Sequence, residues 1–345
     1  AHDSVLLELS ERRDELHANL ITSPKETCEV CRSKKATYEK FRGKLSVPKV
    51  YGLTDMHIEF PAFLKPDKGQ GSRGTYSAAS RKEVEFYIEK DNSLLILEYL
   101  PGKEYTVDCF TDRTGRLRFA GGRERIRVTN GISVDTKPVR NNKFRELAEI
   151  INDTLRFRGA WFFQLKENVR HELVLMEIAP RIAGSMGLYR NLGVNFALLS
   201  LYDAMGLNVE IAYNDYEIEM DRALSNRFRM DLKYRRVYVD FDDCLLIGGQ
   251  LNTVLVAFLY QCLNKGIKLH LLTRHNGNIN ATLGHYRLES LFDSIHHIKG
   301  AEKKSSYISK ESILIDDSFS ERLEVKAELN IPVFGLDAIE CLMEW

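Results

Sequence analysis

The chain has 345 residues, of which 44% are hydrophobic, and this length predicts two or three domains. Lys plus Arg and Asp plus Glu both number 49, so the net charge gives no reason to expect a nucleic acid or a membrane surface as partner. No apolar run is long enough to cross a bilayer, and the charged start AHDSVLLELSERRDEL lacks the apolar core of a signal peptide. We therefore expect a cytoplasmic protein.

The first part of the chain is predicted to be helical, and the next to mix strands with helices. We expect a helical lead-in at 1–45, with one leucine-rich helix and a second helix that ends at Phe41. From 46 to 212 we expect strands at PAFLKP, SLLILEYL, EYTVDCF, RLRFAGG, WFFQLKEN and ELVLMEI, and helices near 80–90, 142–156 and 194–206. Strands in this succession, with few helices, predict an α+β domain.

The last third of the chain has a different pattern of apolar runs and helices. A polar connector at 213–234 leads into a domain at 235–345 with apolar runs at VYVDF, IKLHLLT, SIHHI, SILIDD and PVFGL. Helices such as the one that ends at Gly266 alternate with these runs. This alternation predicts an α/β domain with a doubly wound parallel sheet.

Polar side chains follow the ends of the predicted parallel strands of this C-terminal domain. The strand ends and one helix start supply Asp240 and Asp242, Thr273, Lys304 (with Lys303 as the alternative) and Asp316. Ligands bind at the carboxyl ends of an open parallel sheet, and carboxylates suit Mg²⁺. We therefore expect Mg²⁺ to be held by Asp240, Asp242 and Asp316, although an acidic turn of an ordinary α/β domain is the alternative.

Four segments of this domain, VYVDFDDCLL, LLTRH, EKKSSYI and SILIDDSFSE, resemble the ordered motifs of the haloacid dehalogenase (HAD) superfamily. The resemblance implies a nucleophile, a general acid and base, a phosphate-binding hydroxyl, a charge-neutralising lysine and a metal carboxylate, which are Asp240, Asp242, Thr273, Lys304 and Asp316, and Asp317 could assist Asp316. Cys244 stands where the family has threonine. The intervals between the motifs leave no room for a cap domain, so a capless, HAD-like phosphatase is implied.

The segment KPDKGQGSRG couples a lysine on a strand to a glycine-rich loop. Its GxGxxG spacing is not followed directly by a helix, as a dinucleotide fingerprint requires. A mobile loop over a triphosphate, with Lys65 as a point charge beside it, fits better. Downstream, a strand that ends at Glu98 and Leu100 offers backbone groups to an adenine, and Glu104 can accept hydrogen bonds from a ribose.

Three arginines alternate in GGRERIRVTNG and are expected to share one face of a strand. That face either clamps a carboxylate or phosphate or is solvated, and the sequence leaves both interpretations open. Arg125 is the best candidate for the clamp.

The segments SKKATYEKF, KPDKGQGSRG, EYLPGKE and MEIAPR together resemble ATP-grasp domains of the carbamoyl-phosphate synthase and carboxylate-amine ligase type, over about residues 22–212. The resemblance implies that ATP is bound by Lys34, Lys65, Gly69, Gly71, Ser72, Glu98, Leu100, Glu104 and Arg125. Mg²⁺ or Mn²⁺ would be held by Gln164 and Glu177, and Arg181 would meet the γ-phosphate. Ala179 stands at the place of a metal-binding asparagine.

The two resemblances predict a bifunctional enzyme: an ATP-grasp ligase that joins a small-molecule carboxylate to an amine, and a Mg²⁺-dependent phosphatase for a phosphate ester. One alternative is a phosphatase with a non-catalytic ATP-binding regulatory domain. A second is a carbamoyl-phosphate-synthase-like ligase with an inactive HAD-like domain, and a third is a non-catalytic scaffold. No nucleic acid or membrane partner is expected, and a homo-oligomer remains open.

Overall fold

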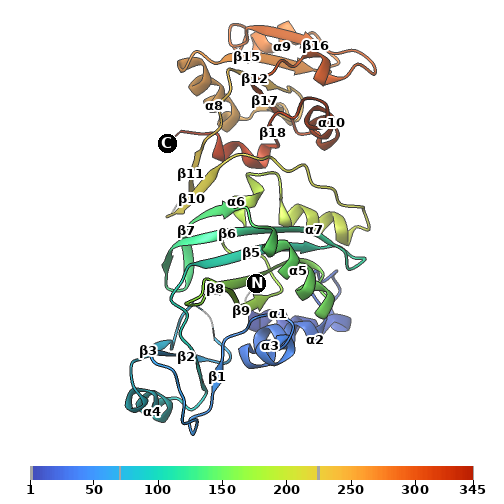
Figure 1. Cartoon of the computed structure of the whole chain (residues 1–345). Coiled ribbons are helices and arrows are strands. Elements are labelled where there is room, and N and C mark those ends of the chain that lie inside the picture. The colour runs from blue at the N-terminus through green and yellow to red at the C-terminus, as the bar shows by residue number, and fades with distance from the viewer. Residues whose placement is uncertain (1–2, 70, 224–225, 345) are drawn as a thin grey trace. The chain divides into compact units, whose positions relative to one another are not determined.

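A computed structural model describes residues 3–69, 71–223 and 226–344 (Figure 1). The contacts divide the chain into two compact units. Unit 1 is Ala1–Gly187, Phe196–Glu210 and Met220–Ala223, and unit 2 is Leu188–Asn195, Ile211–Glu219 and Leu224–Trp345. Within the described ranges, no helix combines the length and the apolar character that a bilayer crossing requires.

These units differ from the division expected at residues 46, 213 and 235. The helical lead-in belongs to unit 1, because Phe41 lies in the main hydrophobic core of that unit. Part of the expected connector belongs to unit 2, where the Asn214 side chain donates to the carbonyl of Val333 at 2.7 Å and accepts from its N–H at 3.2 Å. The polar composition of residues 213–234 does not reveal such hydrogen bonds to a distant segment.

The lead-in forms more and shorter helices than expected. They are α1 (Asp3–Glu11), η1 (Arg13–Glu15), α2 (Lys25–Arg32) and α3 (Lys34–Phe41). The predicted second helix is interrupted at Ser33, which is extended and whose Oγ accepts a hydrogen bond from the Ala36 N–H at 3.1 Å. This N-cap starts a new helix and places Lys34 in its first turn.

A small antiparallel sheet follows, in the order β1-β4-β2-β3. Its elements are β1 (Val50–Tyr51), β2 (Ala62–Pro66), β3 (Tyr76–Ala78), α4 (Arg81–Lys90) and β4 (Leu94–Glu98). In β2, Ala62 and Leu64 are fully buried in the core of this sheet together with Val84 from α4. Because side chains alternate along a strand, Lys65 emerges on the opposite face.

A seven-stranded sheet, of which strands β5 to β9 belong to unit 1, has the strand order β11-β10-β7-β6-β5-β8-β9. Its strands are β5 (Glu104–Thr111), β6 (Leu117–Thr129), β7 (Ile132–Val139), β8 (Gly159–Glu167), β9 (Leu173–Ala179), β10 (Ile218–Arg222) and β11 (Asn226–Met230). The accompanying helices are α5 (Asn142–Thr154), α6 (Gly187–Arg190) and α7 (Phe196–Ala204). Strand β7 was not predicted, and β10 and β11 lie inside the expected connector.

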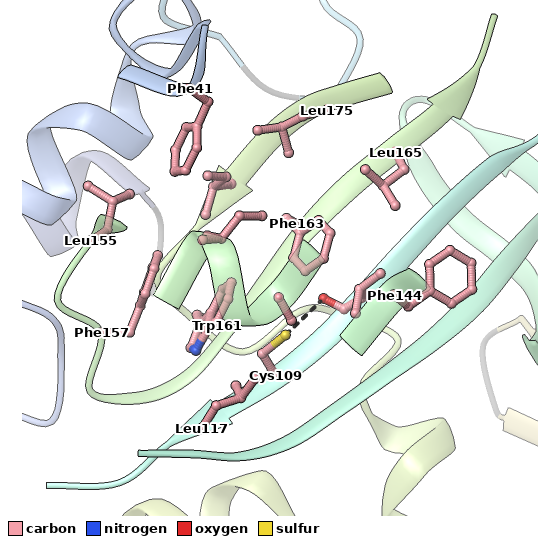
Figure 2. Close-up of a cluster of buried hydrophobic side chains, with 14 of the residues drawn as sticks. Phe41, Cys109, Leu117, Phe144, Leu155, Phe157, Trp161, Phe163, Leu165 and Leu175 are labelled. Carbon is pink, nitrogen blue, oxygen red and sulfur yellow. Dashed lines mark hydrogen bonds between the residues drawn. The ribbon is translucent and has the colours of Figure 1, made fainter. Parts of the chain in front are cut away.

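One face of this sheet carries the main core of unit 1 (Figure 2). Trp161, Phe163 and Leu165 alternate along β8 and pack with Cys109 of β5 and Phe144 of α5, all of them buried. The intervening residues of the same strands therefore point to the opposite face.

Unit 2 is built on a five-stranded parallel sheet in the order β16-β15-β12-β17-β18, which confirms the predicted parallel arrangement. Its strands are β12 (Arg236–Val239), β15 (Lys268–Thr273), β16 (Ser294–His297), β17 (Ser312–Ile315) and β18 (Val333–Phe334). The other elements are the hairpin β13 (Leu246–Ile247) and β14 (Gln250–Leu251), the helices α8 (Thr253–Asn264), α9 (Ile279–His285) and α10 (Phe319–Leu329), and the 3-10 helices η2 (Lys304–Tyr307) and η3 (Leu336–Cys341). The helix expected at Lys303 and Lys304 is only the four-residue η2.

Candidate active sites

A row of polar side chains crosses the sheet of unit 1 on the face opposite its core. Thr106 of β5 lies directly opposite Arg123 of β6 and Gln164 of β8, and Gln164 lies opposite Glu177 of β9. Directly opposed residues of antiparallel strands share a face. The row therefore brings together residues that are up to 71 positions apart in the sequence.

This face borders a cavity of about 1270 Å³. A smaller cavity of about 150 Å³ adjoins it and shares many of its residues. Ten of the residues predicted to bind ATP, its metal or its phosphates line one or both: Lys34, Lys65, Gly69, Gly71, Ser72, Glu104, Arg125, Gln164, Glu177 and Arg181. Glu98 and Leu100, predicted to pair with an adenine, line neither of these two cavities.

Two buried lysines stand at the edge of the smaller cavity. Lys65 is 5% exposed, and burial lowers the pKa of its ammonium to about 8, against the opposing effect of Glu177. Burial also lowers the pKa of Lys34, whose Nζ donates to the carbonyls of Asp67 at 3.2 Å and Gly69 at 3.3 Å. An anionic ligand next to these two buried ammonium groups would stabilise their charged form.

Arg125 bridges two parts of the cavity wall. Its Nε lies 3.3 Å from a carboxylate oxygen of Glu104, and its Nη2 donates to the carbonyl of Gly131 at 2.8 Å. Burial lowers the pKa of Arg125, with Glu104 opposing the shift. Glu104, predicted to accept from a ribose, also pairs with Lys166 at 2.8 Å.

The three alternating arginines do not share one environment. The register shifts between Arg125 and Arg127, and Arg127 is exposed and pairs with Asp221 at 2.6 Å. Arg123 is instead 2% exposed and bonded to Asp108. Arg123 and Arg125 both line the larger cavity, but Arg127 lies beyond the register shift and outside that cavity, so the expectation of one common face was wrong for Arg127.

Arg181 is held by a residue that the sequence did not single out. Its Nε and Nη2 donate to the two carboxylate oxygens of Asp3 on α1, the latter at 3.3 Å. A bidentate arginine and carboxylate pair has the geometry that an arginine uses to bind phosphate. Asp3 therefore takes the position of an anion at the predicted phosphate-binding arginine.

The glycine-rich loop lies against the turn between β6 and β7. Gly71 has φ +62° and Gly131 has φ +73°, values that favour glycine. A Cβ added to Gly131 would come within 2.7 Å of the Gly71 Cα. Gly131 thus permits a close backbone contact that positions the loop, and nothing in the sequence alone pointed to this partner.

The pair Gln164 and Glu177 fits a magnesium ion. Each is partly buried and lines both cavities, and together they offer one carboxylate and one amide oxygen. Mg²⁺ in nucleotide sites takes one or two protein ligands and completes its shell with water and phosphate oxygens. Ala179 offers no ligand, so fewer protein oxygens are available than the ATP-grasp resemblance implies.

The predicted residues of unit 2 converge where the parallel strands end. Lys304 donates to Asp240 at 2.9 Å and to Asp316 at 2.6 Å, and all three side chains are buried. Lys303 is exposed and pairs with Glu328, which favours Lys304 over its neighbour as the site lysine. Burial raises the pKa of Asp240 to about 7, although the Lys304 ammonium opposes the shift.

Asp242 lies apart from this buried group. Both of its carboxylate oxygens are 3.0 Å from Nδ1 of His275, and its side chain is half exposed. Thr273 is fully buried, and its Oγ1 accepts from the His275 N–H at 3.1 Å. His275 therefore links the predicted phosphate-binding hydroxyl to the predicted general acid and base.

A metal ion fits the acidic group of unit 2. Carboxylate oxygens of Asp240, Asp316 and Asp317 lie within 4.8 Å of one another, and this is the cluster of that kind found among the described residues. Oxygen ligands of this number suit Mg²⁺. Asp317, which could assist Asp316, belongs to this group, whereas Asp242, which was also expected to hold the metal, does not.

Comparison with known proteins supports an assignment for the middle of the chain. Residues 90–223 match the family described as ATP-grasp in the biosynthetic pathway with Ter operon. A D-alanine--D-alanine ligase of Petrotoga mobilis is 33% identical over 90 residues, which cover 24% of this chain and 30% of the ligase.

Solved structures of similar fold cover more of the chain. The biotin carboxylase domain of the Hydrogenobacter thermophilus 2-oxoglutarate carboxylase aligns with a TM-score of 0.55 at 15% identity, over 63% of this chain and 55% of that domain. An N5-carboxyaminoimidazole ribonucleotide synthetase in complex with ADP also aligns with a TM-score of 0.55, at 16% identity, over 64% of this chain and 63% of that enzyme. This chain thus spans less than two thirds of the length of these relatives. On the family match and this shared fold, the chain contains an ATP-grasp domain.

Proposed function

We propose that unit 1 is an ATP-dependent ligase that joins a carboxylate to an amine through an acyl phosphate. The observation that carries this proposal is the convergence of Lys34, Lys65, Arg125, Gln164 and Glu177 on one pair of adjoining cavities in a domain of the ATP-grasp fold. An ammonium, a guanidinium and a carboxylate in one wall suit a metal-bound triphosphate.

In the proposed reaction the residues of the cavity hold ATP and an acid side by side. Lys34, Lys65 and Arg125 neutralise the phosphates, and the loop with Gly69, Gly71 and Ser72 covers them. A carboxylate oxygen of the acid attacks the γ-phosphorus, the bond from that phosphorus to the β,γ-bridging oxygen breaks, and ADP leaves. The amine nitrogen then attacks the acyl carbon, loses a proton, and phosphate leaves.

Gln164 and Glu177 would hold Mg²⁺, which supplies charge neutralisation at the phosphates. Arg181 is the proposed partner of the transferring phosphoryl group, because its guanidinium already accommodates a bidentate anion in Asp3. Asp3 must then give way when the phosphate binds.

ADP release tests this function. The full chain is screened with ATP and Mg²⁺ against pools of carboxylates and amines, with Lys65→Ala as the inactive variant. Lys82→Ala is the matched control, since Lys82 is an exposed lysine of α4, the helix that packs against the strand carrying Lys65. ADP formation that needs both an acid and an amine, and that only Lys65→Ala abolishes, supports the ligase. ADP formation without either substrate, or none with any pool, contradicts it.

We propose as a second function that unit 2 is a Mg²⁺-dependent phosphatase of the HAD type. The supporting observation is the Lys304 ammonium between Asp240 and Asp316 at the carboxyl ends of β12 and β17, where the resemblance expects nucleophile, lysine and metal carboxylate. A solvated acidic turn would not bury all three groups.

The proposed phosphatase works through an aspartyl phosphate. An Asp240 oxygen attacks the phosphorus of the ester, the bond from phosphorus to the ester oxygen breaks, and Asp242 gives a proton to that oxygen. Asp242 then takes a proton from water, which attacks the phosphorus of the aspartyl phosphate. Phosphate leaves and Asp240 is free again. His275 orients Asp242. Asp240, Asp316 and Asp317 would hold Mg²⁺, which stabilises charge on the phosphoryl oxygens.

Hydrolysis of para-nitrophenyl phosphate tests the second function. We expect Mg²⁺-dependent release of nitrophenol that Asp240→Asn abolishes. Asp243→Asn is the control, because Asp243 is exposed with φ 53° and asparagine tolerates that conformation. Phosphatase activity without acid- and amine-dependent ADP release favours a regulatory ATP-grasp domain instead. The reverse result favours a ligase with an inactive second unit.

A further inference from the structure

A buried ion pair next to the proposed ligase site uses only part of its arginine. Arg123 is 2% exposed and Asp108 is fully buried. The Arg123 Nε donates to one Asp108 oxygen at 2.7 Å, and its Nη2 donates to the other at 3.3 Å. Asp108 therefore locks the guanidinium in place and leaves one nitrogen, Nη1, for another partner.

Two buried polar groups beside this pair lack a hydrogen-bond partner within the described parts of the chain. They are Nη1 of Arg123 and Oγ1 of Thr106. Thr106 lies directly opposite Arg123 across β5 and β6, and both residues line the cavity of about 1270 Å³. Buried donors without partners are rare in folded proteins, because each loses its hydrogen bonds to water. A ligand oxygen in the cavity would supply a partner for both groups.

The cavity suits an acid. Its wall contains seven basic residues, namely Arg32, Lys34, Arg73, Arg123, Arg125, Arg181 and Arg222, against the acidic residues Asp3 and Glu177. A concave wall with such an excess of cations attracts anions. The phosphates of ATP account for the positive charge at Lys34 and Arg125. Thr106 and Arg123 instead continue the polar row of the sheet on the side away from Glu177.

The strand register gives the distance between an oxygen bound at Arg123 and Thr106 and the proposed metal ligand Gln164. Thr106 is directly opposite Gln164, and Arg123 is one strand beyond Thr106. Neighbouring strands are about 5 Å apart. An oxygen bound at Arg123 and Thr106 is therefore one or two strand spacings, about 5–10 Å, from Gln164. A short dicarboxylic acid spans this interval.

We propose that Arg123 and Thr106 bind a second carboxylate of the acid substrate, so that unit 1 acts on short dicarboxylic acids. This inference rests on the proposed ligase function, in which the first carboxylate is phosphorylated at the end with Gln164 and Glu177. Thr106 is the residue to change, since removal of Arg123 would leave Asp108 buried without its counter-charge.

Calorimetric binding tests the proposal with glutarate as the probe and butyrate as its monocarboxylate counterpart. The full chain is loaded with Mg²⁺ and a non-hydrolysable ATP analogue. We expect glutarate to bind more tightly than butyrate, and Thr106→Val to weaken glutarate by roughly tenfold to one hundredfold while butyrate is unchanged. Equal binding of the two acids, or equal glutarate affinity in Thr106→Val, overturns the proposal.

Thr136→Val is the matched control. Thr136 is fully buried on the neighbouring strand β7, but its hydroxyl already donates to the carbonyl of Glu124 at 2.6 Å, and it lines neither cavity. Without ligand, Thr136→Val should lower the Tm, and Thr106→Val should leave the Tm equal or raise it, because the hydroxyl it removes has no partner. A Thr106→Val that lowers the Tm as much as Thr136→Val shows a structural hydroxyl and contradicts the proposal.

The ligase and the subsite can fail separately. ADP release that is supported equally by monocarboxylates and is insensitive to Thr106→Val keeps the ligase and overturns the dicarboxylate subsite. Glutarate binding that depends on Thr106, in a protein that releases no ADP with any acid and amine, keeps the subsite and overturns the ligase.

Discussion

Lys65 carries a buried charge that should destabilise the protein when no nucleotide is bound. Burial lowers the pKa of its ammonium from the ordinary 10.5 to about 8. Each pKa unit corresponds to about 1.4 kcal/mol, so the charged lysine costs about 3 kcal/mol at pH 7. Lys65→Met keeps an unbranched side chain, one atom shorter, and removes the charge. We therefore expect this variant to be more stable than the parent protein at pH 7 by up to about 3 kcal/mol.

The advantage of Lys65→Met should shrink as the pH rises. Between pH 8 and 10.5 the unfolded lysine binds more protons than the native one, so the free energy of unfolding of the parent protein increases with pH. At pH 9.5 the difference between the two proteins should have fallen to about half of its value at pH 7. Other titrating groups are present in both proteins, so their contributions cancel in the difference between the two free energies of unfolding.

Urea unfolding of both proteins at pH 7 and 9.5, with and without MgATP, measures these effects. MgATP should stabilise the parent protein and have little effect on Lys65→Met, because binding to the native state adds stability only where affinity remains. Lys82→Met is the control for an exposed lysine and should behave as the parent does. A Lys65→Met variant that is less stable than the parent at pH 7 would refute the reasoning.

Three further changes test the packing around the sites. Phe163→Ala should lower the free energy of unfolding by about 3–5 kcal/mol in chemical denaturation, whereas Phe86→Ala, at a half-exposed ring, should cost far less. Gly131→Ala should weaken ATP binding in calorimetry, since its Cβ would collide with the backbone of the glycine-rich loop; unchanged affinity would show that this contact does not position the loop. Asp108→Ala should lower the free energy of unfolding by about 3–5 kcal/mol, because it leaves the buried Arg123 without a counter-charge. A near-neutral effect would contradict the ion pair.

Much of the architecture could be predicted because it depends on local patterns. The strands that carry Lys65, Gln164 and Glu177 lie in short apolar runs, and α8 ends two residues before Gly266, which has φ +70°. The grouping of Asp240 and Asp316 followed from one rule, that parallel strands end at the same edge of a sheet. These features need no knowledge of distant contacts.

The remaining features depend on contacts between distant segments. Ser33 divides a helix through an N-cap and a bond from its hydroxyl to Asp67, 34 positions away. Strand β7 was missed because ISVDTKPV places polar residues on both faces. The pairing of Arg181 with Asp3 spans 178 positions, and no motif indicates it.

Isotope transfer tests the central claim, an acyl phosphate, most directly. The Asp240→Asn variant, which lacks the proposed phosphatase, is given ATP, Mg²⁺, an amine and an acid labelled with ¹⁸O in its carboxylate, chosen from those that support ADP release. If the carboxylate attacks the γ-phosphorus, one ¹⁸O atom per turnover appears in the released phosphate. Released phosphate without the label would contradict the account, since the carboxylate oxygen would then never have been bonded to phosphorus.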